Sequence, residues 1–600
     1  MLRDLGAVLA WIDGRLRLRW AVLVPIMIGA ALVEAVTAIA VFGLLRMVVE
    51  PERVRTAPLV SRLWQAWPGD NPTAVVAALT VLVAAFYVFR ALYLSWAEWV
   101  KESTIAQSAT RAADRLFARF LAADYPFHLR RRSADLIHEV ARSTDLAFQL
   151  FLGSLVNLLT ESAIVAALAV VLAVTAPPQA LIAVAAVLVI AAVPMIVTRR
   201  TWVRAGEKQK VLEAQQFHVL QQSLGAVKEV KIAGREAFFE ARLRGTRREL
   251  AEVRQQRFVV GNALKLGVET VLIVAMLVVV LLITVRGASG ADTVSLLALF
   301  AYAGFRVVPS ANRIMMNAGY VREARAFIAG AIEDFKTLKP EKPRGQVPEP
   351  VVEFTESLAC EGVSYTYETA GVPALINVNL TLRPGDSLGI VGETGSGKST
   401  LVDVLLGLLR PTTGRIVIDG QSLEGRERAW QRLIGYVPQD PYLLDETVRR
   451  NIAFGVPDSS IDEQRLSRAI ASAHLDEVIK ELPDGLDTRL GEHGSRLSGG
   501  QRQRVAIARA LYGDPAVLVF DEATAALDSQ TEREVVTAIA ELHGQRTLIV
   551  IAHRLSTVRG CDRLILLEKG RIAATGTYDQ LMANPVFRAI ALPELTPETR

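Results

Sequence analysis

Long apolar runs constrain this chain more than any other feature of its 600 residues. Crossing the hydrocarbon core of a bilayer takes roughly 20 apolar residues in a helix. Runs of that length recur up to about residue 316, and they predict a bundle of six transmembrane helices. The predicted spans are approximately 20–48, 73–99, 150–176, 179–198, 259–286 and 292–316.

The segments between these spans set the expected orientation. Residues 100–148 and 199–257 are helical in pattern and rich in Arg and Lys, which favours the cytosolic side of a membrane. We therefore expect a multi-pass protein of the cell (inner) membrane. The stretch from Leu2 to Arg15 mixes apolar and charged residues, and it predicts a helix lying along the inner bilayer surface.

The chain changes character after the last apolar run. Residues 1–335 form the predicted transmembrane domain, and the proline-rich segment 336–352 is typical of a linker. From 353 to 600, strand-like runs alternate with helical patterns, which predicts a cytosolic α/β domain. The net charge of +5 reflects the basic loops, and no basic patch interleaved with aromatic residues suggests nucleic-acid binding.

A glycine-rich segment follows the strand-like run Ser387–Val391 and opens a helix, which is the context of a phosphate-binding P-loop. Glycines let backbone N–H groups curl around phosphate oxygens at a helix N-terminus. We expect Lys398 to pair with the β- and γ-phosphates of ATP and the Ser399 hydroxyl to ligate Mg²⁺. The segment consists of Gly392, Glu393, Thr394, Gly395, Ser396, Gly397, Lys398, Ser399 and Thr400.

A second motif is the apolar run Val517–Phe520, which ends in two acids. The carboxylate of Asp521 is placed to hold Mg²⁺. The next residue, Glu522, is placed to act as a general base on the attacking water. These roles need both acids to lie close to the phosphate loop.

The most discriminating motif is Leu-Ser-Gly-Gly-Gln at residues 497–501, followed by a helical pattern. Together with the P-loop and the Asp-Glu pair, it resembles the nucleotide-binding domain of ATP-binding-cassette (ABC) proteins over the whole soluble domain. Six helices ahead of one cassette resemble the exporter class. The implied fold is an exporter-type membrane α-helical bundle fused to a cytosolic α/β P-loop ATPase domain.

The resemblance implies further roles in an ATP-hydrolysing site. Tyr367 matches the aromatic residue that stacks on adenine, with Tyr365 as a nearby competitor. Gln439 matches the residue that senses Mg²⁺ and the attacking water. His553 matches the histidine that contacts the γ-phosphate, and Asp528 belongs to the loop Ala526-Leu527-Asp528.

The same family places the Leu-Ser-Gly-Gly-Gln segment of one copy over the ATP held by the other. Ser498, Gly499, Gly500 and Gln501 are therefore implied ATP contacts across a dimer. One chain has each motif once, so a homodimer is the simplest closed assembly. A heterodimer with a related chain stays open.

The substrate is suggested by a narrower resemblance. Lys228–Glu236 and Phe300–Ser310 resemble segments of bacterial lipid-linked oligosaccharide flippases. Charges inside a membrane are costly and mark functional sites, so Arg90, Lys265 and Arg306 are candidates for gripping a lipid phosphate. In the alternative, these charges pair internally with glutamates.

We therefore expect ATP-driven flipping of a lipid-linked, phosphate-bearing substrate. An exporter of drugs or other hydrophobic compounds is the main alternative. A cassette ATPase that regulates a membrane complex is a third, and the intact Glu522 favours transport over it.

Overall fold

The computed structural model describes residues 2–49, 72–175, 196–285, 290–338, 351–368, 371–522, 529–552 and 554–595. The chain divides into two compact units. The first, which we call the helical unit, comprises Met1–Ala123 and Phe127–Glu341. The second, the sheet unit, comprises Asp124–Pro126 and Lys342–Arg600.

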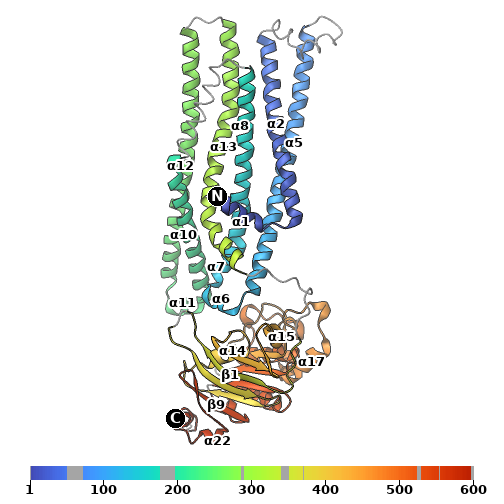
Figure 1. The fold of residues 1–600 in the computed structure, drawn as a ribbon, viewed down its shortest axis with the longest axis vertical. Helices are drawn as coiled ribbons and strands as arrows, with labels where there is room; N and C mark the ends of the chain where they lie inside the picture. The colour runs from blue at the N-terminus through green and yellow to red at the C-terminus, as the bar shows by residue number, and fades with distance from the viewer. Residues whose placement is uncertain are drawn as a thin grey trace. The chain divides into compact units, whose positions relative to one another are not determined.

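Long helices lie side by side in the helical unit, and α5 alone has 51 residues (Figure 1). Up to residue 341, the described part of the chain contains α1 (Leu2–Ala10), α2 (Gly14–Val49), α5 (Pro72–Ala122), α6 (Tyr125–Arg130), α7 (Ser133–His138), the π-helical η1 (Glu139–Ser143) and η2 (Leu146–Gly153), α8 (Ser154–Thr175), α10 (Arg199–Gly225), α11 (Val227–Ala233), α12 (Glu236–Val285) and α13 (Gly290–Thr337).

The predicted spans fall on these helices wherever they are described. They lie in α2, α5, η2 with α8, α12 and α13, whereas the predicted span 179–198 lies mostly outside the described residues, as does the predicted linker 336–352. By length and composition, Gly14–Val41, Val76–Ala122 and Ser133–Val170 are candidate membrane spans within the described part. The predicted number of six is therefore not confirmed.

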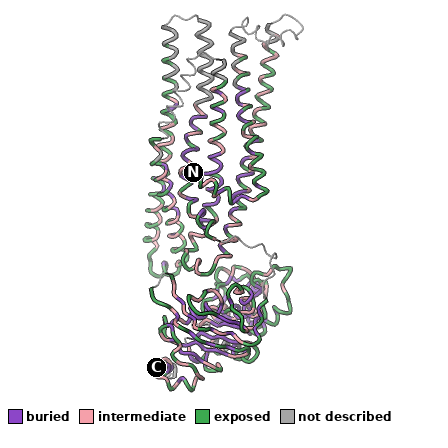
Figure 2. The backbone as a smooth tube through the Cα atoms, viewed as in Figure 1, coloured by how far each residue is buried: buried purple, intermediate pink, exposed green. Residues whose placement is uncertain are grey.

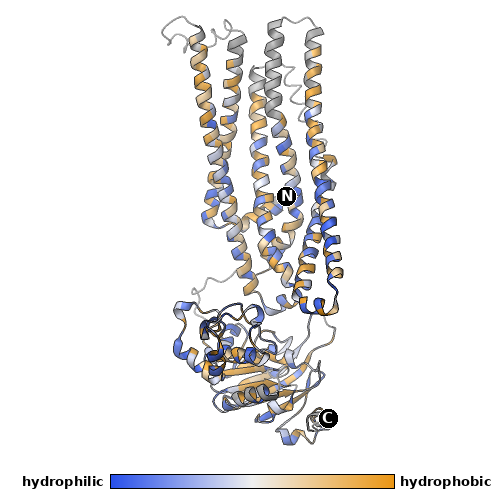
Figure 3. Ribbon diagram, turned by 180° about the vertical axis from the view of Figure 1, so that it is seen from behind, coloured by the Kyte–Doolittle hydropathy of each residue, from blue (hydrophilic) through white to orange (hydrophobic). Residues whose placement is uncertain are grey.

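Several helices continue well beyond their apolar spans. Along α5 and α12 the hydropathy colouring is mostly orange over one part and increasingly blue over the rest (Figure 3). The charged segments 100–122 and 236–257 belong to these same continuous helices. The predicted helical character of both linkers is thus correct, and each linker prolongs a span.

The buried core of the helical unit gathers where α1, the start of α2, α5, η2 and α13 meet (Figure 2). The Trp11 ring lies 5.1 Å from that of Phe335 and 6.3 Å from that of Phe148, measured between centroids. Val8, Trp11 and Ile12 are almost fully buried. These three side chains of the segment expected along the bilayer surface are therefore covered by protein, whereas Leu9 is 39% exposed.

The sheet unit contains two sheets. A four-stranded antiparallel sheet has the order β2-β1-β4-β5, and a six-stranded sheet has the order β10-β9-β3-β8-β7-β6. The strands are β1 (Leu358–Tyr365), β2 (Leu375–Leu382), β3 (Ser387–Val391), β4 (Thr413–Ile418), β5 (Gln421–Ser422), β6 (Ile434–Val437), β7 (Val517–Asp521), β8 (Thr547–Ile551), β9 (Arg563–Glu568) and β10 (Arg571–Gly576).

Helices pack around these sheets and complete the predicted α/β architecture, which is confirmed. They are α14 (Lys398–Leu405), α15 (Glu427–Gln431), α16 (Val448–Ile452), α17 (Glu463–Ser472), α18 (Asp476–Glu481), α19 (Gly499–Tyr512), α20 (Ser529–Glu541), α21 (Leu555–Val558), α22 (Tyr578–Leu581) and α23 (Pro585–Leu595), with short 3₁₀ turns η3 (Asp458–Ser460), η4 (Gly485–Asp487) and η5 (Glu492–Gly494).

The central strands of the larger sheet position the candidate site. β3, β8 and β7 are parallel neighbours, and their apolar side chains are buried on both faces. Parallel strands place their carboxyl ends at one edge of the sheet, where open α/β folds bind ligands. The segments that follow these three strands therefore meet at a single edge.

Candidate active site

The P-loop joins β3 to α14 in a conformation that requires glycine. Gly395 and Gly397 have φ values of 83° and 104°, in the left-handed region that side chains disfavour. A Cβ at Gly397 would lie 2.6 Å from the Ala374 carbonyl oxygen, and one at Gly392 would collide with the carbonyl oxygen of Leu567. The loop therefore curls tightly over the N-terminus of α14.

Lys398 stands inside this loop. Its Nζ donates to the carbonyl oxygens of Gly392 at 2.8 Å and Glu393 at 3.0 Å, and the residue is buried. Burial lowers the pKa of Lys398, while the charges of Glu522 and Asp521 raise it. A buried ammonium group held by two backbone carbonyl oxygens can exchange them for phosphate oxygens.

The hydroxyl groups of the loop also fit an anion. Within the described residues, the buried Ser396 Oγ has no hydrogen-bond partner. Ser399 is exposed on the first turn of α14, and Thr400 Oγ1 lies 3.1 Å from the Tyr367 hydroxyl. The loop thus presents a donor without a partner beside a cation, an arrangement that suits a phosphate group.

Tyr367 and its competitor Tyr365 differ in exposure. Tyr365 is only 8% exposed and belongs to the core beneath β1, whereas Tyr367 is half-buried. The two rings meet edge to face, 4.9 Å apart between centroids. Tyr367 is the more accessible of the two, as its predicted contact with adenine requires.

The two acids at the end of β7 have distinct partners. Asp521 Oδ2 accepts a hydrogen bond from the Tyr436 hydroxyl at 3.1 Å, and Glu522 Oε2 accepts one from Gln439 Nε2 at 2.6 Å. Burial raises the pKa of Asp521, the Tyr436 hydrogen bond lowers it, the Glu522 charge raises it and the Lys398 charge lowers it. Opposing effects thus act on the acid predicted to hold Mg²⁺.

Glu522 adopts an unusual backbone conformation, with φ at 48°. Its backbone N–H donates to the Ile551 carbonyl oxygen at 3.1 Å, which ties it to the end of β8. A non-glycine residue in this region is strained by about 1–3 kcal/mol and persists only where its surroundings impose it. In this conformation the carboxylate of Glu522 accepts the hydrogen bond from Gln439.

The Leu-Ser-Gly-Gly-Gln segment forms the start of α19. Ser498 Oγ accepts from the Gln501 backbone N–H at 3.2 Å, and the Ser498 N–H donates to Gln501 Oε1 at 2.9 Å. This capping box fixes both side chains at the helix end. Because the Ser498 oxygen acts as acceptor, its own hydrogen stays available for an anion. Gly499 and Gly500 form the first residues of the helix.

The structure thus brings Lys398, Asp521, Glu522 and Gln439 to one sheet edge, and it places Ser498 at a separate helix cap. Asp528 and His553 lie outside the described residues. Tyr436 is a site residue that sequence reasoning missed. The signal for it was its place in a strand, directly before the Val437-Pro438-Gln439 motif.

The candidate substrate residues of the helical unit differ in how they are engaged. Arg90 Nη2 lies 2.7 Å from Glu34 Oε1, and the two side chains are only 22% and 5% exposed. Lys265 is exposed on α12, and the side chain of Arg306 lies outside the described set. The Arg90–Glu34 pair is what the internal-pairing alternative predicts, and the phosphate role of Arg90 stays a prediction.

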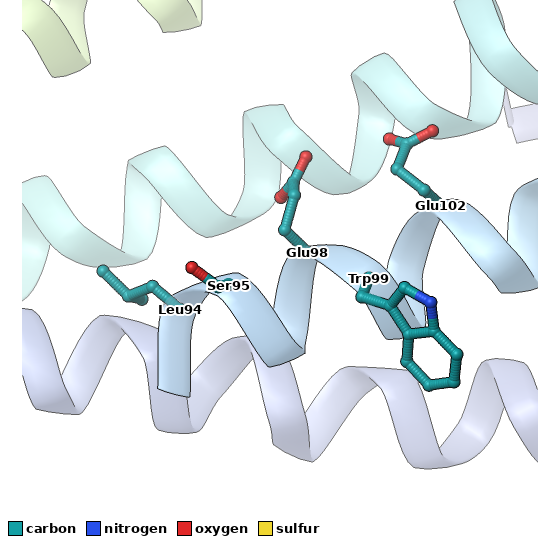
Figure 4. Close-up of a pocket in the computed structure, with 5 residues that line it drawn as sticks. All are labelled: Leu94, Ser95, Glu98, Trp99 and Glu102. Carbon is teal, nitrogen blue, oxygen red and sulfur yellow. The ribbon is translucent and has the colours of Figure 1, made fainter. Parts of the chain in front are cut away.

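A pocket on α5 is lined by Leu94, Ser95, Glu98, Trp99 and Glu102. Figure 4 shows Glu98 and Glu102 pointing to the same side of the helix, with Trp99 on another. Lys101 Nζ contacts Glu98 at 2.5 Å and Asn157 of α8 at 2.8 Å. Two carboxylates at its rim make this pocket a poor place for a phosphate.

Comparisons with known proteins agree with this geometry. Residues 375–525 match the ABC transporter family, and residues 58–305 match the ABC transporter transmembrane region. The chain belongs to the ABC transporter family. It is an ABC exporter with an ATPase domain, whose hydrolysis of ATP is coupled to transport.

Particular relatives sharpen this assignment. The chain is similar to an ATP-dependent lipid A-core flippase of Cupriavidus metallidurans, with 35% identity over 480 residues, 78% of this chain and 79% of the relative. A flippase of the same name from Nitrosococcus oceani is 44% identical over 246 residues, 41% of each chain.

A solved structure of a bacterial Atm1-family ABC exporter with ATP bound is 26% identical, with a TM-score of 0.80. It covers 98% of this chain, and the chain covers 100% of it. The predicted fold class is confirmed. The names of these relatives do not mention a lipid-linked oligosaccharide, so that narrower resemblance stays a prediction.

Proposed function

We propose that two copies of this chain form an exporter that uses Mg²⁺ and ATP to flip a phosphate-bearing lipid across the cell (inner) membrane. The 35% identity to a lipid A-core flippase over 480 residues carries this proposal. The basic segments 100–148 and 199–257 support a cytosolic location for the ATPase domain. A lipid-linked oligosaccharide is the finer substrate proposal.

The residues of the sheet edge fit distinct parts of ATP hydrolysis. The backbone N–H groups of the P-loop and Lys398 Nζ bind phosphate oxygens, and Tyr367 stacks on adenine. The Ser399 hydroxyl and the Asp521 carboxylate hold Mg²⁺, which when bound neutralises charge on the phosphates. Glu522, oriented by Gln439, takes a proton from the attacking water.

The remaining residues complete the site from two directions. His553 contacts the γ-phosphate within the same chain. Ser498, at the N-terminus of the 14-residue helix α19, offers a hydroxyl donor and a partial positive charge to an anion. In the proposed dimer this cap covers the nucleotide of the second copy together with Gly499, Gly500 and Gln501, and Asp528 is a further proposed ATP contact.

A complementation experiment tests the shared site. Lys398→Ala disables the P-loop of a chain, and Ser498→Arg disables its cap. Each variant alone should be inactive, but a mixed dimer contains one site with both parts intact. ATPase activity should therefore reappear when the two are co-expressed and purified through different tags. Mixed dimers as inactive as either parent would contradict a site shared between copies.

A flux experiment tests the substrate class. Wild-type protein in liposomes should remove a labelled diphosphate lipid from one leaflet in the presence of ATP. Arg306→Ala should slow that lipid selectively if the arginine grips phosphate, and a neutral lipid serves as the control cargo. Transport of hydrophobic cations without any lipid flux would favour the drug-exporter alternative.

A further inference from the structure

Tyr436 and Asp521 share one face of the larger sheet. β6 and β7 are parallel, and their register pairs Tyr436 with Val519 and Val437 with Phe520. Side chains two residues apart on a strand point to the same face, so Tyr436, Val519 and Asp521 lie on one side. The phenol of the edge strand β6 thereby reaches Asp521 Oδ2 at 3.1 Å.

Asp521 lies among charges that pull its carboxylate in different directions. Lys398 attracts it, whereas Glu522 and Asp403, a residue of α14, repel it. A carboxylate has two oxygens and can rotate between such neighbours. The hydrogen bond from Tyr436 engages Oδ2 and leaves Oδ1 available as a ligand.

We infer that Tyr436 is a positioning residue that orients the Asp521 carboxylate to bind Mg²⁺. The inference rests on the proposed function, which assigns the metal to Asp521 and Ser399. Groups that hydrogen-bond to a metal ligand fix its orientation, and their loss typically weakens metal affinity by about 10–100-fold.

The position of Tyr436 argues against a purely packing role. The residue is 40% exposed, so its side chain is not enclosed in the buried core. The core on this face is made by fully buried residues such as Val519 and Trp430. Removing one oxygen from Tyr436 therefore changes the partner of Asp521 and leaves the core intact.

Tyr436→Phe tests the inference in the full-length protein. Binding of a fluorescent, non-hydrolysable ATP analogue is measured with saturating Mg²⁺ and with EDTA. We expect the Mg²⁺-dependent gain in affinity to fall about 10-fold, while the affinity in EDTA and the unfolding temperature stay unchanged. Tyr442→Phe, which removes the hydroxyl of a 61% exposed tyrosine of the same unit, should match wild type.

The variant Asp521→Asn distinguishes a failure of the inference about Tyr436 from a failure of the proposed Mg²⁺ site. If Asp521→Asn abolishes the Mg²⁺-dependent gain and Tyr436→Phe preserves it, Tyr436 does not position the ligand. If Asp521→Asn itself preserves the gain, the proposed metal site is wrong. A parallel loss of affinity in EDTA and of thermal stability in Tyr436→Phe would also overturn the inference, because it would indicate a structural role.

Discussion

The sheet unit and the helical unit hold their charged groups in different ways. In the sheet unit, Lys398 is bound by carbonyl oxygens only five and six positions away. The two acids at the end of β7 meet residues in or just after the adjacent strand β6. In the helical unit, Arg90 pairs with Glu34 across 56 positions, and Arg313 Nη2 lies 3.1 Å from Glu161 Oε2 across 152 positions.

This difference separates two kinds of functional argument. A short motif such as the P-loop contains most of the contacts that fix its own geometry, so its role follows from its residues. A charge on a long helix obtains its partner from helix packing. The same arginine can grip a substrate or lock two helices, and only its surroundings decide between these roles.

The largest effect should come from Glu522→Gln in the sheet unit. The amide cannot take a proton from water, so ATP turnover should fall about 10³-fold. It can still accept a hydrogen bond from Gln439 Nε2, which should preserve ATP binding. Steady-state hydrolysis and nucleotide affinity measure the two effects. Turnover within tenfold of wild type would remove Glu522 from the proposed base role, and the exposed Glu541→Gln serves as the control.

The next effect concerns the Arg90–Glu34 pair of the helical unit. Glu34→Gln leaves the guanidinium largely buried beside a neutral amide, so the free energy of unfolding should fall by about 3 kcal/mol. Thermal unfolding in detergent measures this loss. The exposed pair of Arg415 and Glu361, 2.7 Å apart, is the matched control, and Glu361→Gln should cost less than about 1 kcal/mol.

The same pair offers a sharper distinction. If Arg90 only locks α2 to α5, the double variant Glu34→Met, Arg90→Met should recover stability and lipid flux together. If Arg90 also grips the lipid phosphate, stability should recover while flux stays low. A double variant less stable than Glu34→Gln alone would show that the pair does not act as a unit.

The part of the structure that could be predicted from the sequence also differs between the two units. The P-loop could be predicted because Gly395, Gly397 and Lys398 impose their own conformation. The hydrogen bond between Tyr436 and Asp521 could not be predicted, because it depends on the register of two strands. The two residues lie 85 positions apart in the sequence. Tyr436 has no signal of its own in the sequence beyond its place in a strand.

The helical unit shows the complementary limit. Apolar length predicted where helices run, but not how far they continue or what covers them. The amphipathic pattern before Arg15 predicts an apolar helix face, but it does not show whether lipid or protein covers that face. In the structure Trp11 packs against Phe335. Likewise, the charge of Arg90 was visible in the sequence, whereas its proximity to Glu34 depends on the packing of α2 against α5.

A substitution of intermediate effect tests whether the residues of the P-loop fix its backbone conformation. Gly397→Ala combines a φ of 104° with a Cβ only 2.6 Å from the Ala374 carbonyl oxygen. We expect a loss of about 2–3 kcal/mol in the free energy of unfolding. Gly395→Ala has a comparable φ but no atom within 4 Å of the new Cβ, so it should lose only about 1 kcal/mol. Equal losses would show that crowding by Ala374 is unimportant.

The smallest effect concerns a carboxylate of the sheet unit whose charged neighbour is another acid. Burial, and then the charge of Asp521, raises the pKa of Asp403 from its ordinary value of 3.8 to about 6. Between these values the folded chain binds more protons than the unfolded one, so this residue lowers stability as pH rises through that window.

Asp403→Asn should therefore stabilise the nucleotide-free protein at pH 7.5 by about 1–2 kcal/mol. The gain should shrink on acidification and vanish near pH 4, where the native carboxyl is already neutral in the folded chain. Thermal unfolding at pH 7.5, 6 and 4.5 measures the trend, and Asp476→Asn controls for the loss of an exposed carboxylate. A gain that did not decline on acidification would mean that the asparagine stabilises the protein through new hydrogen bonds. The gain would then not come from removing a charge that burial and Asp521 disfavour.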